Sequence, residues 1–143
     1  MPIRPDHRWL YPIDWRELSA LVRFQRAKGR CEHCGRPHGA TVRHLGDGRW
    51  YDEERRCWRD DRGRRVPGLP APDRLPPDLL SRQLRLAGLP GESTLPITRV
   101  ILASAHLDHD PGNNHQRNLA ALCQRCHLAH DRPEHRRRRW TTL

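Results

Sequence analysis

The chain has 143 residues and a formal net charge of +10, with 27 basic against 17 acidic side chains. Hydrophobic residues make up 35% of it, and no apolar run approaches the roughly 20 residues of a membrane-spanning helix, which excludes an integral membrane protein. The length suits a single domain over residues 1–143 whose small core calls for disulfides or a metal. All basic residues except Lys28 are arginine, and this excess favours a polyanionic partner.

The first residues, MPIRPDHRWLYP, lack the apolar segment of a secretory signal, so we expect a cytoplasmic protein. A helix is predicted over residues 14–28. Asp14 and Glu17 have the spacing of a capping box, and Ile13 and Leu18 have that of a hydrophobic staple. The inner face of this helix is predicted to consist of Leu18, Leu21, Val22 and Gln25.

Residues 36–98 are interpreted as an insertion of hairpins and loops. Short strands are expected over residues 41–45, 49–52 and 57–60. The sequence Gly46-Asp47-Gly48 is typical of a hairpin turn between the first two. Residues 63–77 are rich in Pro, Gly and Arg, which indicates a loop.

A short helix is predicted over residues 78–87, and its inward side chains would be Leu79, Leu80, Leu84 and Ala87. Residues 99–107 (RVILASAHL) form the most apolar run of the chain. This run predicts a buried strand.

Two Cys-x-x-Cys pairs, Cys31 with Cys34 and Cys123 with Cys126, indicate a structural zinc site. Each pair can bind one tetrahedral ion through two thiolates, and four thiolates complete the site. Two disulfides are the alternative, but a chain without a secretory signal is expected in a reducing compartment. Cys57 is left over and is interpreted as a small buried thiol.

The segment from Ala105 to His127, AHLDHDPGNNHQRNLAALCQRCH, resembles the HNH family of ββα-metal nucleases. In that family a His at a strand end precedes a Gly/Asn-rich loop, and Asn-Leu precedes Leu-Cys-x-x-Cys-His at a helix. The match covers residues 99–131, and the pair at Cys31 extends it to the zinc-binding members. The resemblance implies a small α+β fold, a zinc-stapled ββα-metal core with an N-terminal helix and the insertion.

Phosphodiester hydrolysis needs an activated water and a cation that offsets charge on the phosphate. His106, at the end of the predicted strand, would be the neutral general base. His127 and Asp131 lie four residues apart on the predicted last helix and would hold a catalytic divalent ion, Mg²⁺, Mn²⁺ or another. By resemblance, Asn118 would hold the loop and orient His106 through hydrogen bonds. The products, again by resemblance, would carry a 5′ phosphate and a 3′ hydroxyl.

One position departs from the family. The residue before the base His is often an Asp or His that ligates the metal, and here it is Ala105. The ion would then be held by His127, Asp131, phosphate oxygens and water, or Asp108 would be a further ligand, or the site is weakened. A role in loop structure is the simpler interpretation of Asp108.

Other histidines are given lesser roles. His109 and His115 are weaker candidates for the general base because neither stands at the strand end. His130 is expected to point away from the face of His127 and not to bind the ion. His33 and His38 flank the first cysteine pair and are interpreted as surface residues.

Residues 132–143 are expected to form a basic tail that begins around Pro133. Four arginines there are interpreted as contacts to DNA phosphates: Arg136, Arg137, Arg138 and Arg139. A second cluster in the insertion could also contact a DNA duplex: Arg55, Arg56, Arg59, Arg62, Arg64 and Arg65. No element that reads bases is recognisable, so affinity for duplex DNA should be largely electrostatic and fall steeply with salt.

The sequence therefore predicts a metal-dependent endonuclease, a monomer by default, that nicks or cuts DNA. Small HNH proteins of this kind occur in phages and mobile elements. One alternative is a non-catalytic, zinc-stabilised nucleic-acid-binding module whose degenerate site is marked by Ala105, and it predicts salt-sensitive binding without cleavage. Another is an RNA-binding or protein-interaction zinc module, and it predicts a preference for RNA or a protein over duplex DNA.

Overall fold

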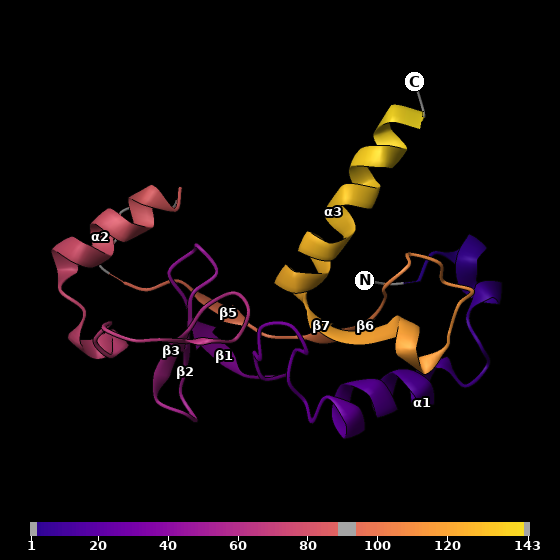
Figure 1. Cartoon of the computed structure of the whole chain (residues 1–143), viewed down its shortest axis with the longest axis horizontal. Coiled ribbons are helices and arrows are strands. Elements are labelled where there is room, and N and C mark those ends of the chain that lie inside the picture. Colours follow the sequence, from indigo (N-terminus) through magenta and orange to yellow (C-terminus); the bar gives the residue numbers. More distant parts are fainter. Residues whose placement is uncertain (1–2, 89–93, 142–143) are drawn as a thin grey trace. The chain divides into compact units, whose positions relative to one another are not determined.

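The computed structural model describes residues 3–88 and 94–141, and its fold is α+β. The chain divides into two compact units (Figure 1). The terminal unit consists of Met1–Glu32 and Ile101–Leu143, and the inserted unit of His33–Val100, which contains the predicted insertion. Over the described residues, no helix has both the length and the apolar character that crossing a membrane requires.

An antiparallel pair of strands forms the centre of the terminal unit. β6 (Leu102–His106) pairs with β7 (Leu119–Cys123), so that His106 lies opposite Leu119. α3 (Gln124–Thr141) follows β7 directly. This strand–strand–helix order agrees with the one predicted over residues 99–131.

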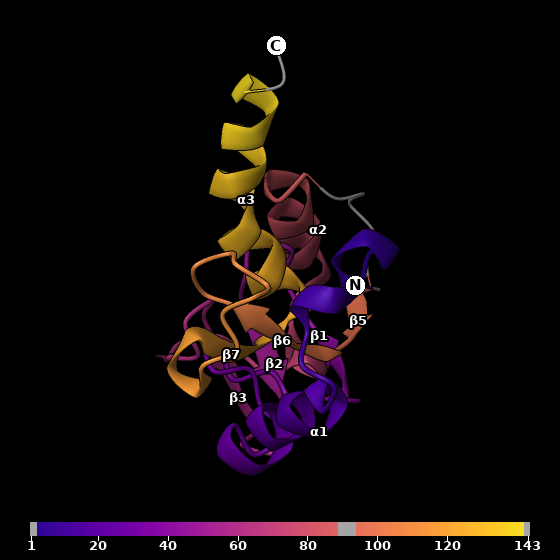
Figure 2. The ribbon, with the colours of Figure 1, turned by 90° about the vertical axis from the view of Figure 1, so that its right-hand side faces the viewer.

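Helical segments cover both faces of this hairpin. α3 contacts both strands from one side, and the continuous segment of α1 (Trp15–Ala20) and η2 (Leu21–Arg26) lies on the other, as Figures 1 and 2 show. Leu102, Leu119 and Leu122 are buried between them. Two short 3₁₀ helices complete the unit, η1 (Pro5–Leu10) and η4 (Gln116–Asn118).

The predicted strand over residues 99–107 is divided in two. β5 (Ile97–Arg99) belongs to the inserted unit, and β6 begins only at Leu102. The backbone between them bonds elsewhere, since the amide of Ile101 donates to Oε1 of Gln124 at 3.1 Å. The Ile101 side chain is exposed, so the apolar run is not buried throughout.

The N-terminal helix lacks the predicted cap. Asp14 makes no side-chain capping bond, because its backbone (φ −95°, ψ 21°) is not in the extended conformation of a capping residue. Ile13 is fully exposed and so does not pack against the helix start. The predictions of a capping box and a hydrophobic staple are therefore wrong.

The inner face of this helix also differs from the prediction. After Ala20 the hydrogen bonding widens to the π type over η2, which turns the later residues around the axis. Ser19 and Val22 are buried, whereas Leu21 and Gln25 are exposed. The buried hydroxyl of Ser19 is hydrogen-bonded, because it lies 2.9 Å from that of Ser104 on β6.

Arg26 and Glu32 fasten the chain to β7. The amide of Glu32 donates to the carbonyl of Ala121 at 2.9 Å, and its Oε2 accepts from the Ala121 amide at 2.7 Å. Nε and Nη2 of Arg26 donate to the carboxylate of Glu32, at 2.9 and 2.8 Å. Its guanidinium also donates to the carbonyls of Gln116, at 2.8 Å, and Leu119. The residues just before the first cysteine pair are thus joined to the central hairpin.

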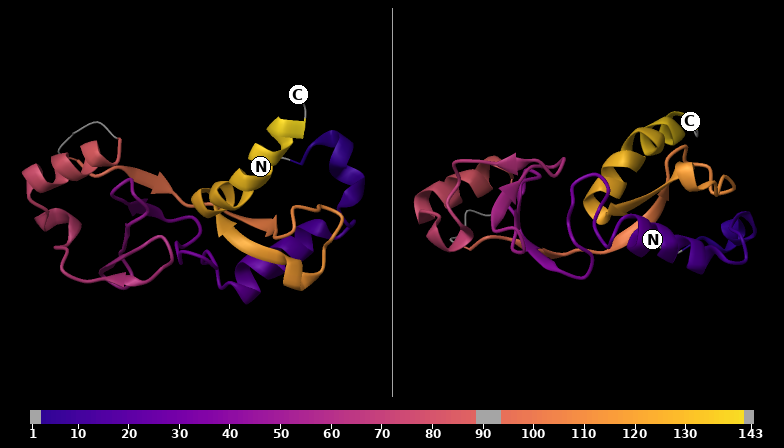
Figure 3. Two further views of the ribbon diagram at one scale, coloured as in Figure 1. Left: turned by 45° about the horizontal axis from the view of Figure 1, so that its top comes forward. Right: turned by 60° about the horizontal axis from the view of Figure 1, so that its bottom comes forward.

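Within its described residues, the inserted unit contains two small antiparallel sheets and one α-helix. β1 (Thr41–Arg43) pairs with β5, and β2 (Trp50–Asp52) pairs with β3 (Cys57–Arg59), which pairs with β4 (Arg65–Val66). α2 (Pro77–Leu86) lies beside these strands in Figure 3. A 3₁₀ turn, η3 (Pro72–Arg74), precedes it.

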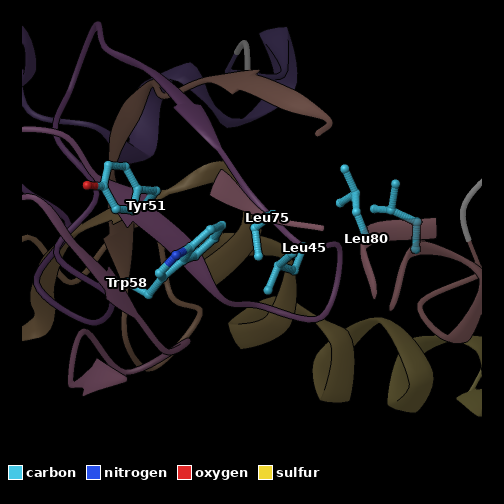
Figure 4. Close-up of a cluster of buried hydrophobic side chains, with 6 residues drawn as sticks. Leu45, Tyr51, Trp58, Leu75 and Leu80 are labelled. Carbon is cyan, nitrogen blue, oxygen red and sulfur yellow. The ribbon is translucent and has the colours of Figure 1, made fainter. Parts of the chain in front are cut away.

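The core of the inserted unit joins α2 to the sheet. Trp58 is almost fully buried, and its indole Nε1 donates to the carbonyl of Pro70 at 2.7 Å. Figure 4 shows Leu45 and Leu75 beside Trp58, with Leu80 of α2 beyond them. The whole buried cluster consists of Leu45, Tyr51, Trp58, Leu75, Leu80 and Leu84.

Several predictions for this unit need correction. The turn at Gly46–Gly48 is closed only by the bridge of His44 with Trp50, because β1 takes β5 as its partner. Residues 63–77 contain β4 and η3 and are not a plain loop. In α2, Leu79 is exposed, and the predicted buried thiol of Cys57 is half-exposed.

Two arginines of the predicted second DNA-binding cluster have structural partners. Nε of Arg59 donates to Oδ2 of Asp52 at 2.8 Å, and that carboxylate side chain is only 1% exposed. Nε of Arg64 donates to Oδ2 of Asp60 at 2.8 Å. Since a buried carboxylate without a partner is costly, Arg59 is needed where it is. It is therefore not available to a nucleic acid.

Candidate functional site

The four predicted zinc ligands lie together. One sulfur from each of Cys31, Cys34, Cys123 and Cys126 is within 4.8 Å of every other, and all four residues are buried. Thiolates bound to zinc at about 2.3 Å in a tetrahedron lie about 3.8 Å apart, so this set fits a structural zinc ion. None of the five cysteines, all of them in the described ranges, is joined to another by a disulfide. The structure thus supports the thiolate interpretation over the disulfide alternative.

A cleft of about 630 Å³ opens in the terminal unit. Its walls come from the N-terminal segment, α1, β6, the loop after β6, and α3. Three predicted site residues line it: His106, His127 and Asp131. Residues far apart in the sequence therefore share one cavity, as the predicted chemistry requires.

His106 ends β6 and is held on two sides by aromatic rings. The indole of Trp15 stacks on the imidazole, with ring centroids 5.3 Å apart and planes at 14°. The ring of Tyr11 meets it edge-on at 5.7 Å. Burial also raises the pKa of Tyr11, so its hydroxyl stays protonated. These contacts restrict the imidazole to one orientation.

Asn114 selects the tautomer of His106. The side-chain Nδ2 of Asn114 lies 3.1–3.3 Å from the carbonyl oxygens of Leu10, Pro111 and Gly112, which can only accept. Oδ1 of Asn114 therefore faces Nε2 of His106, at 2.9 Å. Nε2 must carry the proton of the neutral ring and donate, which leaves the lone pair on Nδ1. A neutral His106 could accept a proton only at Nδ1.

Asn118 holds the loop, as predicted, but among the described residues it makes no hydrogen bond to the imidazole of His106. Its Nδ2 donates to Oδ1 of Asp108 and to the carbonyl of Asn113, both at 2.8 Å, and its Oδ1 accepts from the Asp108 amide at 3.1 Å. It stabilises the loop, and the amide that contacts His106 is that of Asn114. The roles of the two amides differ because of their places in the loop. Asn114 lies within hydrogen-bond distance of the His106 ring, whereas Asn118 directly precedes β7 and bonds to Asp108 and Asn113.

Asp108 has the structural role that was the simpler interpretation. Its carboxylate accepts from Nδ2 of Asn113 at 2.7 Å, from the Asp110 amide at 2.9 Å, and from Nδ2 of Asn118 at 2.8 Å. These bonds, led by the one from Asn113, lower the pKa of Asp108 to about 2. The carboxylate is therefore fully ionised at neutral pH and is engaged within the loop.

Asp131 lies at the centre of a histidine cluster. Its Oδ2 is 3.3 Å from Nε2 of His127, one helical turn earlier on α3, as the spacing predicted. Its Oδ1 is 3.4 Å from Nδ1 of His109 in the loop after β6. Burial lowers the pKa of His127, and the Asp131 carboxylate opposes this only in part. His127 is thus neutral near pH 7, the form in which an imidazole binds a metal.

His130 lies in the cluster with His109 and Asp131, so the predicted orientation away from it is wrong. Its ring stacks on His109, with centroids 4.4 Å apart and planes at 19°. One donor atom from each of His109, His130 and Asp131 lies within 4.8 Å of the others. A helix places residues i and i+3 on neighbouring positions, so His127 and His130 can face the same cluster.

The predicted basic tail is helical. α3 continues through Pro133 to Thr141, so Arg136–Arg139 lie on its last turns. Nε of Arg138 donates to Oε1 of Glu134 at 3.1 Å, and both residues line the cleft. Arg4 and Arg23 line it as well. A helix holds these guanidinium groups in a more regular array than a mobile tail would.

Sequence reasoning missed four residues of this site: Tyr11, Trp15, Asn114 and His109 as a neighbour of Asp131. The aromatic pair precedes β6 by some 90 positions in the chain, and no spacing rule links them. The pair Asn113-Asn114 was a signal, because Asn side chains commonly hydrogen-bond to backbone groups within loops and turns. No protein family model, no curated protein and no solved structure matches the chain.

Proposed function

We propose that the chain is a metal-dependent endonuclease of the HNH type that hydrolyses phosphodiester bonds in DNA. One observation carries the proposal: a histidine whose Nε2 is held by Asn114, which leaves Nδ1 as the acceptor of the neutral ring, shares a cleft with a second histidine and a carboxylate that suit a divalent ion. General base and cation site are the two components that hydrolysis of a phosphodiester requires. The resemblance of residues 99–131 to the HNH pattern supports the same reaction.

In this mechanism His106 takes a proton from the attacking water through Nδ1. Its Nε2–H bond to Asn114 keeps the ring in that tautomer and stabilises the imidazolium that forms. Stacking on Trp15 prevents the ring from rotating away from the water. The base is thus oriented before substrate arrives, which lowers the entropic cost of the step.

His127 and Asp131 would hold the catalytic ion, and their donor chemistry fits one. A neutral imidazole and a carboxylate both offer lone pairs, and their donor atoms lie 3.3 Å apart. When bound, a divalent ion there would offset the charge on the phosphate and on the departing 3′ oxygen. Burial favours the neutral His127 that such binding needs.

DNA would be bound mainly through its phosphates. Arg4, Arg23 and Arg138 line the cleft, and Arg136–Arg139 follow along α3. Guanidinium groups form bidentate bonds with phosphate oxygens and carry no sequence information in doing so. The substrate class is therefore a nucleic-acid backbone, for which we propose duplex DNA.

A plasmid-nicking assay with Mg²⁺ or Mn²⁺ tests the proposal. The parent protein should convert supercoiled DNA to nicked or linear forms, and His106→Ala should lower the rate at least about 100-fold, the contribution of a general base. Gln116→Ala is the matched control, since its exposed side chain lies in the same loop, and it should cleave like the parent.

Three results would contradict the proposal in different ways. A folded His106→Ala variant that cleaves at the parental rate would exclude His106 as the base. Salt-sensitive DNA binding without cleavage in either metal would favour a non-catalytic binding module. Preference for RNA over duplex DNA in competition would exclude the proposed substrate.

A further inference from the structure

We propose that His109 and His130 join Asp131 in a binding site for a divalent transition-metal ion, and that His109 supplies the ligand that residue 105 lacks. The inference deepens the proposed function and rests on it only for the ion's part in cleavage. The ligand set itself is argued from four features of the terminal unit: donor spacing, a tautomer, a backbone conformation and the surroundings of residue 105.

The spacing of the donor atoms suits an ion better than a hydrogen bond. Nδ1 of His109 lies 3.4 Å from Oδ1 of Asp131, whereas a strong N–H···O bond has a separation of about 2.9 Å. Two donors that each lie about 2.0–2.1 Å from a tetrahedral ion are separated by about 3.3–3.4 Å. One donor of His130 completes a set in which all three atoms lie within 4.8 Å of one another.

A hydrogen bond fixes the tautomer of His130. Its Nε2 lies 3.3 Å from the backbone carbonyl of His106, which can only accept, so Nε2 carries the proton. The lone pair of the neutral ring is then on Nδ1. Metal-binding histidines commonly donate their second ring N–H to a backbone carbonyl or carboxylate, which fixes the ring and makes the ligating nitrogen more basic.

The backbone of His109 adds an independent observation. Its φ of 62° lies in the left-handed region, which a residue other than Gly rarely adopts. Such conformations persist where the surroundings hold them, and they concentrate at functional sites. This conformation accompanies a ring stacked on His130 and beside Asp131, at the edge of the cleft.

The alternative ligands near this position are less suitable. Ala105 is 1% exposed and offers no donor atom in its side chain. Asp108 uses both carboxylate oxygens within its loop, where they accept from Asn113, Asp110 and Asn118. His109 is the next donor along the chain, and its ring already faces Asp131.

The ligand types also indicate the class of ion. Imidazole nitrogen favours Zn²⁺, Ni²⁺, Fe²⁺ and similar ions, whereas Mg²⁺ prefers oxygen ligands and retains most of its water. Two imidazoles and one carboxylate, with the imidazole of His127 beside Oδ2 of the same carboxylate, therefore select a first-row transition metal over Mg²⁺. Mn²⁺ accepts both nitrogen and oxygen ligands and does not compete well with Zn²⁺ for thiolates, so it is a suitable probe.

The test is a titration of the zinc-loaded protein with Mn²⁺, in which electron paramagnetic resonance measures the free ion. The parent should bind one Mn²⁺, and His109→Asn and His130→Ala should each weaken binding at least about 10-fold. Asn tolerates left-handed backbone, so His109→Asn keeps the loop conformation while removing the imidazole. His109→Gly excludes ligation by the Asn side chain. His115→Ala, a loop histidine outside the cluster, should bind Mn²⁺ like the parent.

The outcomes separate this inference from the proposed function. Parental Mn²⁺ affinity in folded His109→Gly and His130→Ala would overturn the site, even if the parent cleaves DNA. Displacement of Mn²⁺ by an equal concentration of Mg²⁺ would overturn the choice of ion. Loss of Mn²⁺ binding in both variants would support the site, and a parent that then cleaves no DNA would contradict only the endonuclease.

Discussion

Single side-chain amides and carboxylates organise the loop between β6 and β7. Asp108, Asn113 and Asn118 bond to one another across its base, and Asn114 alone reaches the imidazole of His106. Spacing in the sequence placed His106, His127 and Asp131 in one site, because strand ends and helix turns have fixed geometry. It could not tell Asn114 from Asn118, because an irregular loop has no period from which the direction of a side chain follows.

The low pKa of Asp108 predicts how the stability of the loop depends on pH. Its folded pKa of about 2 is below the ordinary 3.8, so its hydrogen bonds stabilise the loop fully above pH 3.8. That contribution should decline as the pH falls below 3.8 and be lost once it passes 2. A two-dimensional NMR titration that follows the Asp110 amide, whose N–H donates to this carboxylate, measures it directly.

Asn113→Ala removes the bond that contributes most to the shift and should raise the Asp108 pKa toward 3.8. A midpoint near 4 in the parent protein would show that the carboxylate lacks these partners in solution.

Helix α3 departs most from what its sequence suggests. A proline in a helix interior removes one hydrogen bond and crowds the preceding turn, so the sequence favours an end near Pro133. The helix nevertheless runs from Gln124 to Thr141, and the pair of Glu134 with Arg138 spans one turn after the proline. The sequence pattern located the start of this helix at the second cysteine pair but misplaced its end. The proline rule considers one residue and omits stabilising pairs such as that of Glu134 with Arg138.

Replacing the proline should stabilise the helix. Pro133 is exposed, so Pro133→Ala changes little packing but restores a donor for the carbonyl of Ala129. The intrinsic difference between the two residues in a helix interior is about 3 kcal/mol, an upper bound because the fold already accommodates the proline. Helical ellipticity and the thermal midpoint should both rise, as circular dichroism measures. A lower midpoint would mean that the proline makes contacts the structure does not have.

Two features stabilise the fold of the whole molecule: the set of four cysteines and the separate core of the inserted unit. The sequence indicated the zinc ligands because Cys-x-x-Cys is a local spacing that lets two thiolates reach one ion. It predicted Leu80 and Leu84 as inward side chains of a helix, but not their packing in the core around Trp58, whose members come from residues 45 to 84. Long-range packing of this kind depends on which surfaces meet, and no short motif encodes that.

Zinc should decide whether the structure around the four cysteines forms. Structural zinc sites of this type bind with about 10–16 kcal/mol, whereas a whole domain is stable by about 5–15 kcal/mol. Purified protein should contain one zinc per chain by elemental analysis, and Cys126→Ser should lose both the zinc and the cooperative thermal transition. Cys57→Ser is the matched control, because Cys57 is outside the set and half-exposed. Full zinc content in Cys126→Ser would exclude the site.

The pairing of β1 with β5 has an evolutionary consequence. The amide of Gly39 donates to the carbonyl of Val100, and the amide of Val100 to the carbonyl of Ala40, both at 2.8 Å. The two ends of the segment between Ala40 and Val100 are therefore adjacent. Deletions, duplications or exchanges within residues 44–96 leave the positions of both ends unchanged. Selection can accordingly vary this segment's length and surface charge while the residues of the cleft remain as they are.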